Sequence, residues 1–400
     1  MIKYFIKLII YKFFTRINNN YITFISFNGK YADSPKAITK YIHEIDKSKK
    51  LFWLVNNVDN EEIPSYVKKI KYNSFKAWIC YCKSKIIIDN VFCMHEYYYE
   101  GKSIKSKIKY KLVSFLKNKK GQRFYTTWHG TPIKKILTDS INSNITEFSC
   151  PNTTMFLDNK YAYEILNRVT FNKIKIVQMG SPKNDILFDK KISLDDLKTK
   201  LKLPINNKII LFAPTFRTDD NKVNSINRSG IDQLNMINIE ELLNHMKTKF
   251  EGNWSLVCRF HYHVEKQLNW EELKQKYGNK IINGNEHDDI MEYLMCANVL
   301  ITDMSSCLFD FALTEKPIFV FFPDAENYKK NERGLYFDIS ELPVQCATDY
   351  DSLLSNIDSF NYNEYKNNIC RFLTKMGYIK ENEASQKMAK YILEDGEKFE

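Results

Sequence analysis

The chain has 400 residues, 44% of them hydrophobic and 14% aromatic, which excludes an intrinsically disordered polypeptide and suffices for two α/β domains. Its net charge of +11 is uneven: residues 1–150 carry 27 Lys and Arg against 11 Asp and Glu, giving +16, so the remainder carries −5. Nine cysteines without a CxxC pair argue against a zinc motif and indicate reduced thiols in a cytosolic protein.

The N-terminal segment 1–17 is basic and aromatic. Lys3, Lys7, Lys12 and Arg16 interrupt its apolar runs, so none approaches the ~20 residues that span a bilayer, and no small-residue cleavage site follows. Because these charges do not gather on one helical face, a clean amphipathic helix is not expected. Two interpretations stay open: a segment lying on a membrane surface, or an ordinary first helix packed on its domain.

Short apolar runs alternate with helical patterns through the first half of the chain. Such strand–helix alternation predicts a parallel sheet with crossover helices. The expected strands are 22–27, 51–55, 85–89, 123–128 and 174–179, and the expected helices are 35–45 and 74–82.

Segment 101–120 has eight lysines and no acidic residue, with apolar residues interleaved. An anionic membrane surface suits this pattern, at about 1 kcal/mol for each basic side chain near the headgroups. Nucleic acid is the competing partner, and a solvated helix is the third interpretation. The interleaved apolar residues are Ile104, Ile108, Leu112, Val113, Phe115 and Leu116.

The strand–helix pattern then restarts, which predicts a second doubly wound sheet. We expect two Rossmann-type domains, 1–185 and 186–400, facing a central cleft in which ligands bind beyond the carboxyl ends of the strands. The helical patterns at 350–375 and 380–395 suit either domain, and we assign them to the second. The expected strands are 208–214, 254–260, 280–283, 298–303 and 316–322, and the separating helices are 238–249, 287–296 and 305–314.

The segment WHGTP, Trp128–Pro132, closes an expected strand and precedes an expected helix. Thr131 suits the N-cap and Pro132 the first helical turn, while Gly130 lets a ligand approach the backbone. The positive helix end would disfavour an imidazolium ion, so a neutral His129 is a candidate general base. The alternative is a structural histidine bonded to backbone.

Two other strand ends carry basic residues. Arg259, His261 and His263 lie at the end of one strand, where one of the two histidines could bind a phosphate or protonate a leaving group. His263 raises a metal interpretation, but no third ligand is evident. Arg217 follows another strand and is either a bidentate phosphate ligand or a solvated loop residue.

A possible anion site precedes the expected helix 305–314. Ser305 and Ser306 follow Asp303 there, and free amides with two hydroxyls either bind an anion or cap the helix. Downstream, Arg333 precedes Gly334 in a loop and could reach a phosphate. Neither GxxxxGK[ST] nor GxGxxG occurs, so ATP- or NAD-driven chemistry has little support.

Taken together, these segments resemble the CDP-glycerol glycerophosphotransferase family of teichoic-acid and capsule-polymer enzymes, which act in bacterial cell-wall synthesis. The resemblance is in order and spans most of residues 20–350. It is carried by SFNGKYADSPKAI (26–38), TTWHGTPIKKI (126–136), GSPKNDILF (180–188), ILFAPTFR (210–217), DIMEYLMCANVLITDMSSCLFDFALTEKPIFVFFPDAENY (289–328) and ERGLYFD (332–338).

The resemblance implies a GT-B-like fold and site residues. His129 matches the family's proposed catalytic base, and His261 its second essential histidine. The predicted substrate-binding residues are Gly130, Thr131, Asn184, Asp185, Arg217, Arg259, Asp303, Ser305, Ser306, Arg333 and Gly334.

The implied reaction is transfer of a polyol phosphate from CDP-glycerol or CDP-ribitol to a hydroxyl of a polyprenyl-diphosphate-linked saccharide or growing polymer, with release of CMP. We expect a peripheral enzyme on the cytoplasmic face of the membrane, bound to its anionic surface and not to nucleic acid. No cofactor is predicted; Mg²⁺ is compatible with the chemistry, but no dedicated metal site is evident.

Departures from the family pattern concern the donor site: Lys183 replaces the usual Arg, Tyr262–His263 the His-Pro continuation, and Met304 a Tyr.

Two alternative functions remain: a GT-B glycosyltransferase using a nucleotide sugar for cell-surface polysaccharide, and a non-enzymatic membrane-surface binding protein. The sequence predicts neither the polyol nor the oligomeric state, and it does not separate a primase from a polymerase or teichoic acid from capsule.

Overall fold

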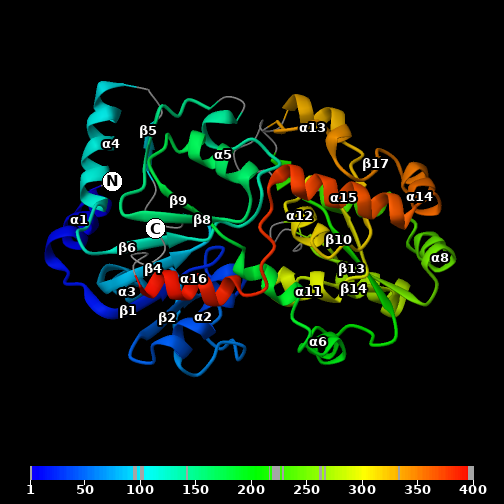
Figure 1. The fold of residues 1–400 in the computed structure, drawn as a ribbon, viewed down its shortest axis with the longest axis horizontal. Helices are drawn as coiled ribbons and strands as arrows, with labels where there is room; N and C mark the ends of the chain where they lie inside the picture. Colours follow the sequence, from blue (N-terminus) through cyan, green and yellow to red (C-terminus); the bar gives the residue numbers. More distant parts are fainter. Residues whose placement is uncertain are drawn as a thin grey trace. The chain divides into compact units, whose positions relative to one another are not determined.

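The structure, a computed structural model, describes residues 2–92, 97–99, 103–140, 143–215, 217–218, 226–227, 229–260, 264, 267–331 and 334–394. The chain divides into two compact units, whose elements are labelled in Figure 1. The first contains the chain up to His129, Leu137–Asp185 and the chain from Gly377 onward. The second contains Gly130–Ile136 and Ile186–Met376.

The first unit is built on a seven-stranded sheet in the order β3-β2-β1-β4-β6-β8-β9, with parallel neighbours throughout. The sheet strands are β1 Asn18–Phe24, β2 Lys50–Val55, β3 Val67–Lys71, β4 Ser84–Asp89, β6 Arg123–Thr126, β8 Thr153–Leu157 and β9 Lys175–Gln178, and β5 Tyr97–Tyr99 pairs with β7 Glu147–Ser149. The helices are α1 Ile2–Ile9, the π-helix η1 Ile10–Phe14, α2 Asp33–Ile45, α3 Phe75–Lys83, α4 Ile104–Lys117, η2 Leu137–Asp139, α5 Lys160–Val169, η3 Pro182–Leu187 and α16 Ala384–Leu393.

Apolar side chains on both faces of this sheet are buried, as expected for parallel strands covered by helices. Trp53 of β2 packs in a core with α2 and α16, whereas its neighbour Leu54 packs in a second core with α3 and Tyr11 of η1. Ile88 and Ile87 of β4 divide between the two cores in the same way. The period of two along each strand therefore explains the continuous apolar runs of the sequence.

The second unit has a six-stranded sheet in the order β14-β13-β10-β15-β16-β17, again with parallel neighbours. The sheet strands are β10 Lys208–Ala213, β13 Trp254–Cys258, β14 Ile281–Asn283, β15 Val299–Thr302, β16 Ile318–Phe321 and β17 Cys346–Ala347, and β11 Arg217–Thr218 pairs separately with β12 Ile226–Asn227. Its helices are α6 Leu194–Lys200, α7 Ser229–Asn235, α8 Ile239–Phe250, α10 Trp270–Tyr277, η4 Gly278–Lys280, α11 Ile290–Cys296, α12 Cys307–Ala312, α13 Ala325–Asn331, η5 Ile339–Glu341, α14 Tyr350–Asp358 and α15 Tyr362–Met376.

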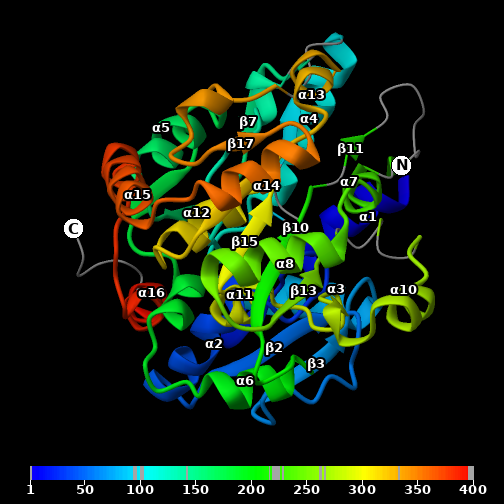
Figure 2. The same cartoon turned by 90° about the vertical axis from the view of Figure 1, so that its right-hand side faces the viewer.

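Helices α8 and α14 lie side by side over this second sheet (Figure 2). Met246 of α8 and Leu353 of α14 share a core with Phe212 of β10 and Phe321 of β16. Both strand orders are of the doubly wound type, with a reversal at β1/β4 in one sheet and at β10/β15 in the other. The predicted fold class, two Rossmann-type α/β domains, is confirmed.

The C-terminal helix belongs to the first unit. We expected all of 186–400 in the second domain, but the chain from Gly377 onward is part of the first unit. Helix α16 lies beside α2 (Figure 1), where Met388 and Ile392 join the core of Ile38 and Trp53. Burial of this apolar face against the first sheet explains the return of the chain.

No helix in the described ranges has the length and apolar character needed to cross a membrane.

Strand β3 was not predicted, because its sequence VKKIK carries three lysines. It lies at the edge of the first sheet, where lysines are common because they discourage pairing with another chain.

Candidate active site

His129 follows the carboxyl end of β6 in a sharp backbone turn. Trp128 has a φ of 51°, in the left-handed region, and Gly130 has a φ of 153°. The amide of Thr127 still donates to the carbonyl of Asp89 at 2.8 Å, so the chain follows β4 for one residue beyond β6 before it turns. This turn places His129 at the carboxyl end of β4, one strand from the β1/β4 reversal.

The helix expected after Pro132 does not form. Instead, residues 133–136 pair with residues 334–336: the amide of Lys135 donates to the carbonyl of Gly334 at 3.0 Å, and the amide of Tyr336 to that of Ile133 at 2.9 Å. These bonds use the backbone groups that a helix would need. Thr131 is buried in this extended segment and is not a helix N-cap.

The ring of His129 is oriented by a backbone carbonyl. Its Nδ1 lies 2.9 Å from the carbonyl oxygen of Asn90. A carbonyl only accepts hydrogen bonds, so Nδ1 carries the hydrogen and the neutral ring has its lone pair on Nε2. The imidazole is therefore held in the tautomer that a general base acting through Nε2 requires.

Burial keeps this imidazole neutral. It lowers the pKa of His129 to about 4, the nearby Lys183 charge acts in the same direction, and the Asn90 hydrogen bond opposes both. The sequence predicted a neutral His129 but attributed it to a helix N-terminus. The physical causes are instead desolvation and a neighbouring cation.

Lys183 joins the GSPKND segment to this histidine. Its Nζ donates to the carbonyl of His129 at 3.1 Å, and its amide donates to the Ser34 hydroxyl at 3.3 Å. Both Lys183 and Asn184 are buried, and the Asn184 Oδ1 atom has no hydrogen-bond partner within the described part of the chain. Asn184 therefore keeps an acceptor for a ligand group or water.

Asp185 contacts the start of α16. Its carboxylate accepts from the amides of Ala384 at 3.1 Å and Ser385 at 2.8 Å, at the start of α16. Both oxygens thus satisfy donors at a helix N-terminus. Asp185 therefore helps to hold α16 in place, and its contact with substrate stays a prediction.

Two residues near His129 were missed by the sequence analysis. Ser26 follows β1 and Asn90 follows β4, so they flank the strand-order reversal, where such sheets bind ligands. The Asn90 Oδ1 accepts from the amide of Phe27 at 3.1 Å. Its Nδ2 and the Ser26 hydroxyl are buried without a partner among the described residues. Polar residues directly after buried strands were the signal that could have identified both.

The second unit has a buried ion-pair cluster at its own strand reversal. Asp303 follows β15, and its Oδ2 lies 2.8 Å from an Arg217 nitrogen. Arg217 also binds Asp324 through two nitrogens, at 2.8 and 2.9 Å. Thr215, after β10, donates to both Asp303 oxygens at 2.9 Å through its amide and its hydroxyl. The cluster therefore ties together the loops that follow β10, β15 and β16.

This cluster changes the interpretation of Arg217 and Asp303. Burial opposes the Arg217 charge, but Asp303 and Asp324 raise the pKa of its guanidinium above the ordinary value. With two carboxylates on one guanidinium, the charge expected for a donor diphosphate is already compensated. Arg217 and Asp303 therefore hold these loops together, and contact of either residue with the donor phosphates stays a prediction.

Arg259 is also engaged with backbone. Its guanidinium donates to the carbonyls of Gly284 at 2.6 Å, His287 at 2.8 Å and Asp288 at 2.7 Å. It therefore fixes the loop after β14 next to the end of β13. The residues that continue the chain, His261 and His263, lie outside the described residues, as does Arg333.

The other predicted positions lie around α12 and in the paired segment. Ser305 and Ser306 precede α12 and are partly exposed, and the Ser306 side chain makes no capping hydrogen bond. Gly334 is buried with a φ of 76° and accepts from Lys135. Across the described ranges, no group of three or more His, Cys, Asp or Glu side chains is placed to hold a metal ion.

Known proteins are similar to this chain in sequence and in fold. Residues 7–394 match the model of the family described as CDP-Glycerol:Poly(glycerophosphate) glycerophosphotransferase. A teichoic acid poly(glycerol phosphate) polymerase of Bacillus spizizenii is 28% identical over 403 residues, covering 94% of this chain and 92% of that one. One of the same description from Staphylococcus epidermidis is 26% identical over 397 residues, covering 94% of this chain but 50% of its own length.

A solved structure of the wall teichoic acid polymerase TagF, in a variant form soaked with CDPG, has a TM-score of 0.73 and 25% sequence identity. The match covers 96% of this chain and 91% of that one. This chain thus spans half the length of the staphylococcal relative and nearly all of the Bacillus relative. The family match extends over almost the whole sequence and includes both sheets. The chain therefore belongs to the CDP-glycerol:poly(glycerophosphate) glycerophosphotransferase family.

Proposed function

We propose that the chain transfers glycerol phosphate from CDP-glycerol to a hydroxyl of a lipid-linked saccharide or growing teichoic-acid polymer, and releases CMP. The observation that carries this proposal is the neutral His129, whose Nδ1 is occupied by Asn90 so that Nε2 is the basic atom. The family supplies the class of reaction, and the relatives named above are teichoic acid enzymes.

In this reaction, the acceptor hydroxyl donates its proton to Nε2 of His129. The hydroxyl oxygen forms a bond to the glycerol-bearing phosphorus while the bond from that phosphorus to the bridging oxygen breaks. CMP leaves with that oxygen and its electron pair, and the proton on His129 is passed to solvent when the product departs. Phosphoryl transfer of this kind depends on positioning and charge neutralisation more than on covalent chemistry.

The paired state of Arg217 limits what can neutralise the developing phosphate charge. Its two carboxylate partners leave the Arg217–Asp303–Asp324 cluster with one net negative charge. His261 and Arg333, which match the family motifs, are then the expected phosphate ligands, together with the hydroxyls of Ser305 and Ser306.

The test compares the wild type with His129→Gln and His129→Ala, using CDP-glycerol and a lipid-linked disaccharide acceptor. Mass spectrometry should detect added glycerol phosphate only with the wild type, whereas both variants should retain the wild-type circular dichroism spectrum. General-base loss commonly lowers the rate about 10²–10⁴-fold. A variant with wild-type turnover would refute the base assignment. Assays with CDP-ribitol and with nucleotide sugars as donors distinguish transfer of glycerol phosphate from transfer of ribitol phosphate and from transfer of a sugar.

We further propose that the first unit rests on the anionic cytoplasmic face of the membrane through the surface of α1, η1 and α4, here called the α1/α4 surface. Lys12 joins these elements, since its Nζ donates to the Asn118 carbonyl at 2.9 Å and lies 3.5 Å from the Phe115 ring centre. Apolar side chains on this surface are exposed, although Tyr11 between them is buried. The exposed ones are Ile6, Ile9, Ile10, Phe13, Phe14, Ile104, Ile108, Leu112 and Phe115.

The exposed residues of α4 recur every three or four positions, which places them on one side of the helix. Lysines of the same helix alternate with them. This arrangement of apolar and basic side chains suits a helix lying in the headgroup region of an anionic leaflet. It also combines the two interpretations of segment 1–17, since Tyr11 packs in the core while its neighbours face outward.

Flotation with phosphatidylglycerol vesicles tests the membrane proposal. Replacing Lys105, Lys109 and Lys111 with Gln should weaken partitioning by about two orders of magnitude, at about 1 kcal/mol per basic side chain. A control with the same loss of charge replaces Lys47, Lys68 and Lys173, which are exposed on other elements. Equal partitioning of the two triple variants would refute this orientation.

A further inference from the structure

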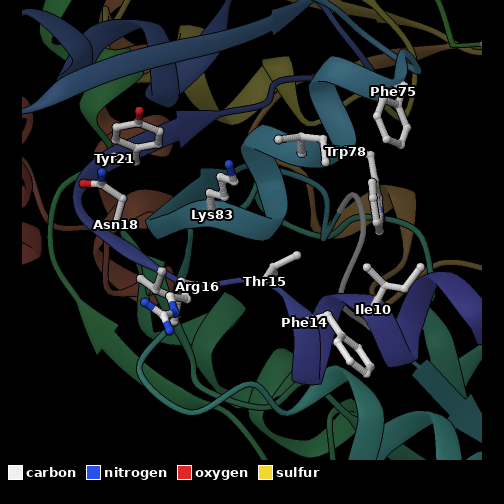
Figure 3. A pocket seen from close by; sticks show the side chains of 11 residues that line it. Ile10, Phe14, Thr15, Arg16, Asn18, Tyr21, Phe75, Trp78 and Lys83 are labelled. Atoms are coloured by element: carbon white, nitrogen blue, oxygen red, sulfur yellow. The ribbon is translucent and has the colours of Figure 1, made fainter.

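The first unit contains a pocket of about 740 Å³ that none of the proposed chemistry uses. It is lined by residues of η1, β1, the segment between them, and α3 (Figure 3). This pocket, here called the η1/α3 pocket, lies next to the α1/α4 surface, because Ile10 and Phe14 belong to both.

The pocket has one apolar side and one polar side. Figure 3 shows Ile10, Phe14, Phe75 and Trp78 together on one side, and Arg16 and Lys83 toward the other. The Phe14 and Phe75 side chains are 76% and 71% exposed. Exposed apolar side chains that gather around a hollow and are bordered by polar residues indicate an interaction site.

Within the described part of the chain, the cationic side of the pocket has no counter-charge. Neither Arg16 nor Lys83 forms an ion pair or hydrogen bond with any described residue, and both are exposed. Two uncompensated cations beside an apolar hollow match a ligand with an anionic head and a hydrocarbon tail.

We propose that the η1/α3 pocket binds one anionic phospholipid molecule of the bilayer, with its phosphate at Arg16 and Lys83 and an acyl chain along Phe14, Phe75 and Trp78. This inference rests on the proposed membrane location and adds a specific lipid site to it. The excess positive charge of residues 1–150 and the continuity with the α1/α4 surface favour a bilayer phospholipid over a protein segment. The bound lipid would fix the orientation of the first unit on the membrane.

Trp78 provides a direct probe of the site. Phosphatidylglycerol with brominated acyl chains quenches tryptophans that its chains contact. The chain has five tryptophans, so the Trp78 share is taken as the difference between the wild type and Trp78→Phe. We expect brominated phosphatidylglycerol to quench Trp78, both in vesicles and as short-chain monomers below their micelle concentration. Unquenched Trp78 in both forms would overturn the proposal.

The charge requirement is tested with Arg16→Gln combined with Lys83→Gln. This double variant should lose most of the Trp78 quenching by the monomeric lipid, whereas the control pair Lys47→Gln and Lys173→Gln should keep it. Phe75→Ser should weaken quenching without unfolding the chain, because its side chain is already exposed. If both charge pairs behave alike, the headgroup assignment is wrong.

Three further outcomes separate the lipid-site proposal from other occupants of the pocket and from the membrane proposal. If Trp78 is quenched only by brominated phosphatidylcholine, or only when a polyprenyl phosphate is present in neutral vesicles, the pocket does not bind an anionic phospholipid and the proposed occupant is wrong. If vesicles fail to bind while the monomeric lipid still quenches Trp78, the membrane orientation fails and the lipid site stands. If vesicles bind through the α4 lysines but Trp78 is never quenched, the membrane proposal stands and the lipid site falls.

Discussion

The imidazole Nδ1 of His129 lies 2.9 Å from the carbonyl oxygen of Asn90, so the residue that follows β4 orients the ring that follows β6. The contact is to backbone, and hence no substitution of the Asn90 side chain removes it directly. It fixes a single neutral tautomer. The His129 imidazole is thus oriented by a backbone carbonyl at the end of the neighbouring strand.

The pH dependence of His129 follows from its burial. Since its pKa is lowered to about 4, the imidazole should stay neutral from pH 8 down to about pH 5 and act as a base throughout. Nitrogen NMR of histidine-labelled protein should show a resonance that titrates near pH 4 and has its hydrogen on Nδ1. Its assignment follows from its disappearance in His129→Gln. A His129 titration near 6.5 would contradict the buried environment described above.

The same lowered pKa predicts an acid-sensitive stability. Unfolded chain binds the His129 proton with a pKa near 6.5, and folded chain only near 4, so the unfolded state takes up more protons between these values. Stability should fall as the pH falls from 6.5 to 4, by up to about 3 kcal/mol. His129→Gln should lack this component. Urea unfolding of both proteins at pH 7, 5.5 and 4.5 measures it, and parallel losses in both would exclude His129 as the cause.

Local sequence patterns predicted most of the sheet architecture but not the long-range contacts. Strands such as β2 and β10 are continuous apolar runs, and these were identified because burial on both faces leaves that signature. The helix expected after Pro132 was wrong because residues 133–136 pair with residues 334–336, about 200 positions away. No local pattern encodes a partner at that distance.

For the candidate site too, local sequence patterns did not predict the long-range contacts. The position of His129 after a buried strand was visible in the sequence, whereas the pairing of Arg217 with Asp303, 86 residues apart, was not. An arginine after a strand has the same local pattern whether it binds a phosphate or two carboxylates. Only the fold places Asp303 and Asp324 around it.

Breaking the Arg217 cluster should destabilise the second unit. Arg217→Met leaves Asp303 buried without its counter-charge, a change that typically costs about 3–5 kcal/mol. Arg217→Lys should recover little, because an ammonium group cannot bind Asp324 through two nitrogens while reaching Asp303. Thermal unfolding of the variants measures this. The control Lys202→Met removes the exposed ion pair with Glu286 and should leave the midpoint unchanged. A soluble Arg217→Met with the wild-type midpoint and weaker donor binding would restore Arg217 as a phosphate ligand.

Asp185 stabilises the start of α16. The Asp185 carboxylate accepts from the amides of Ala384 and Ser385, so Asp185→Ala leaves two donors at the start of α16 without a partner. Loss of such a cap costs about 1 kcal/mol. The loss should be local: hydrogen exchange should accelerate in α16 and in α2, against which it packs, while β10 and β13 of the other unit stay protected. Asp185→Asn keeps one acceptor oxygen and should lie between the wild type and Asp185→Ala. If Asp185→Ala instead leaves α16 exchange unchanged and raises the KM for donor or acceptor, Asp185 contacts substrate as the sequence motif first indicated.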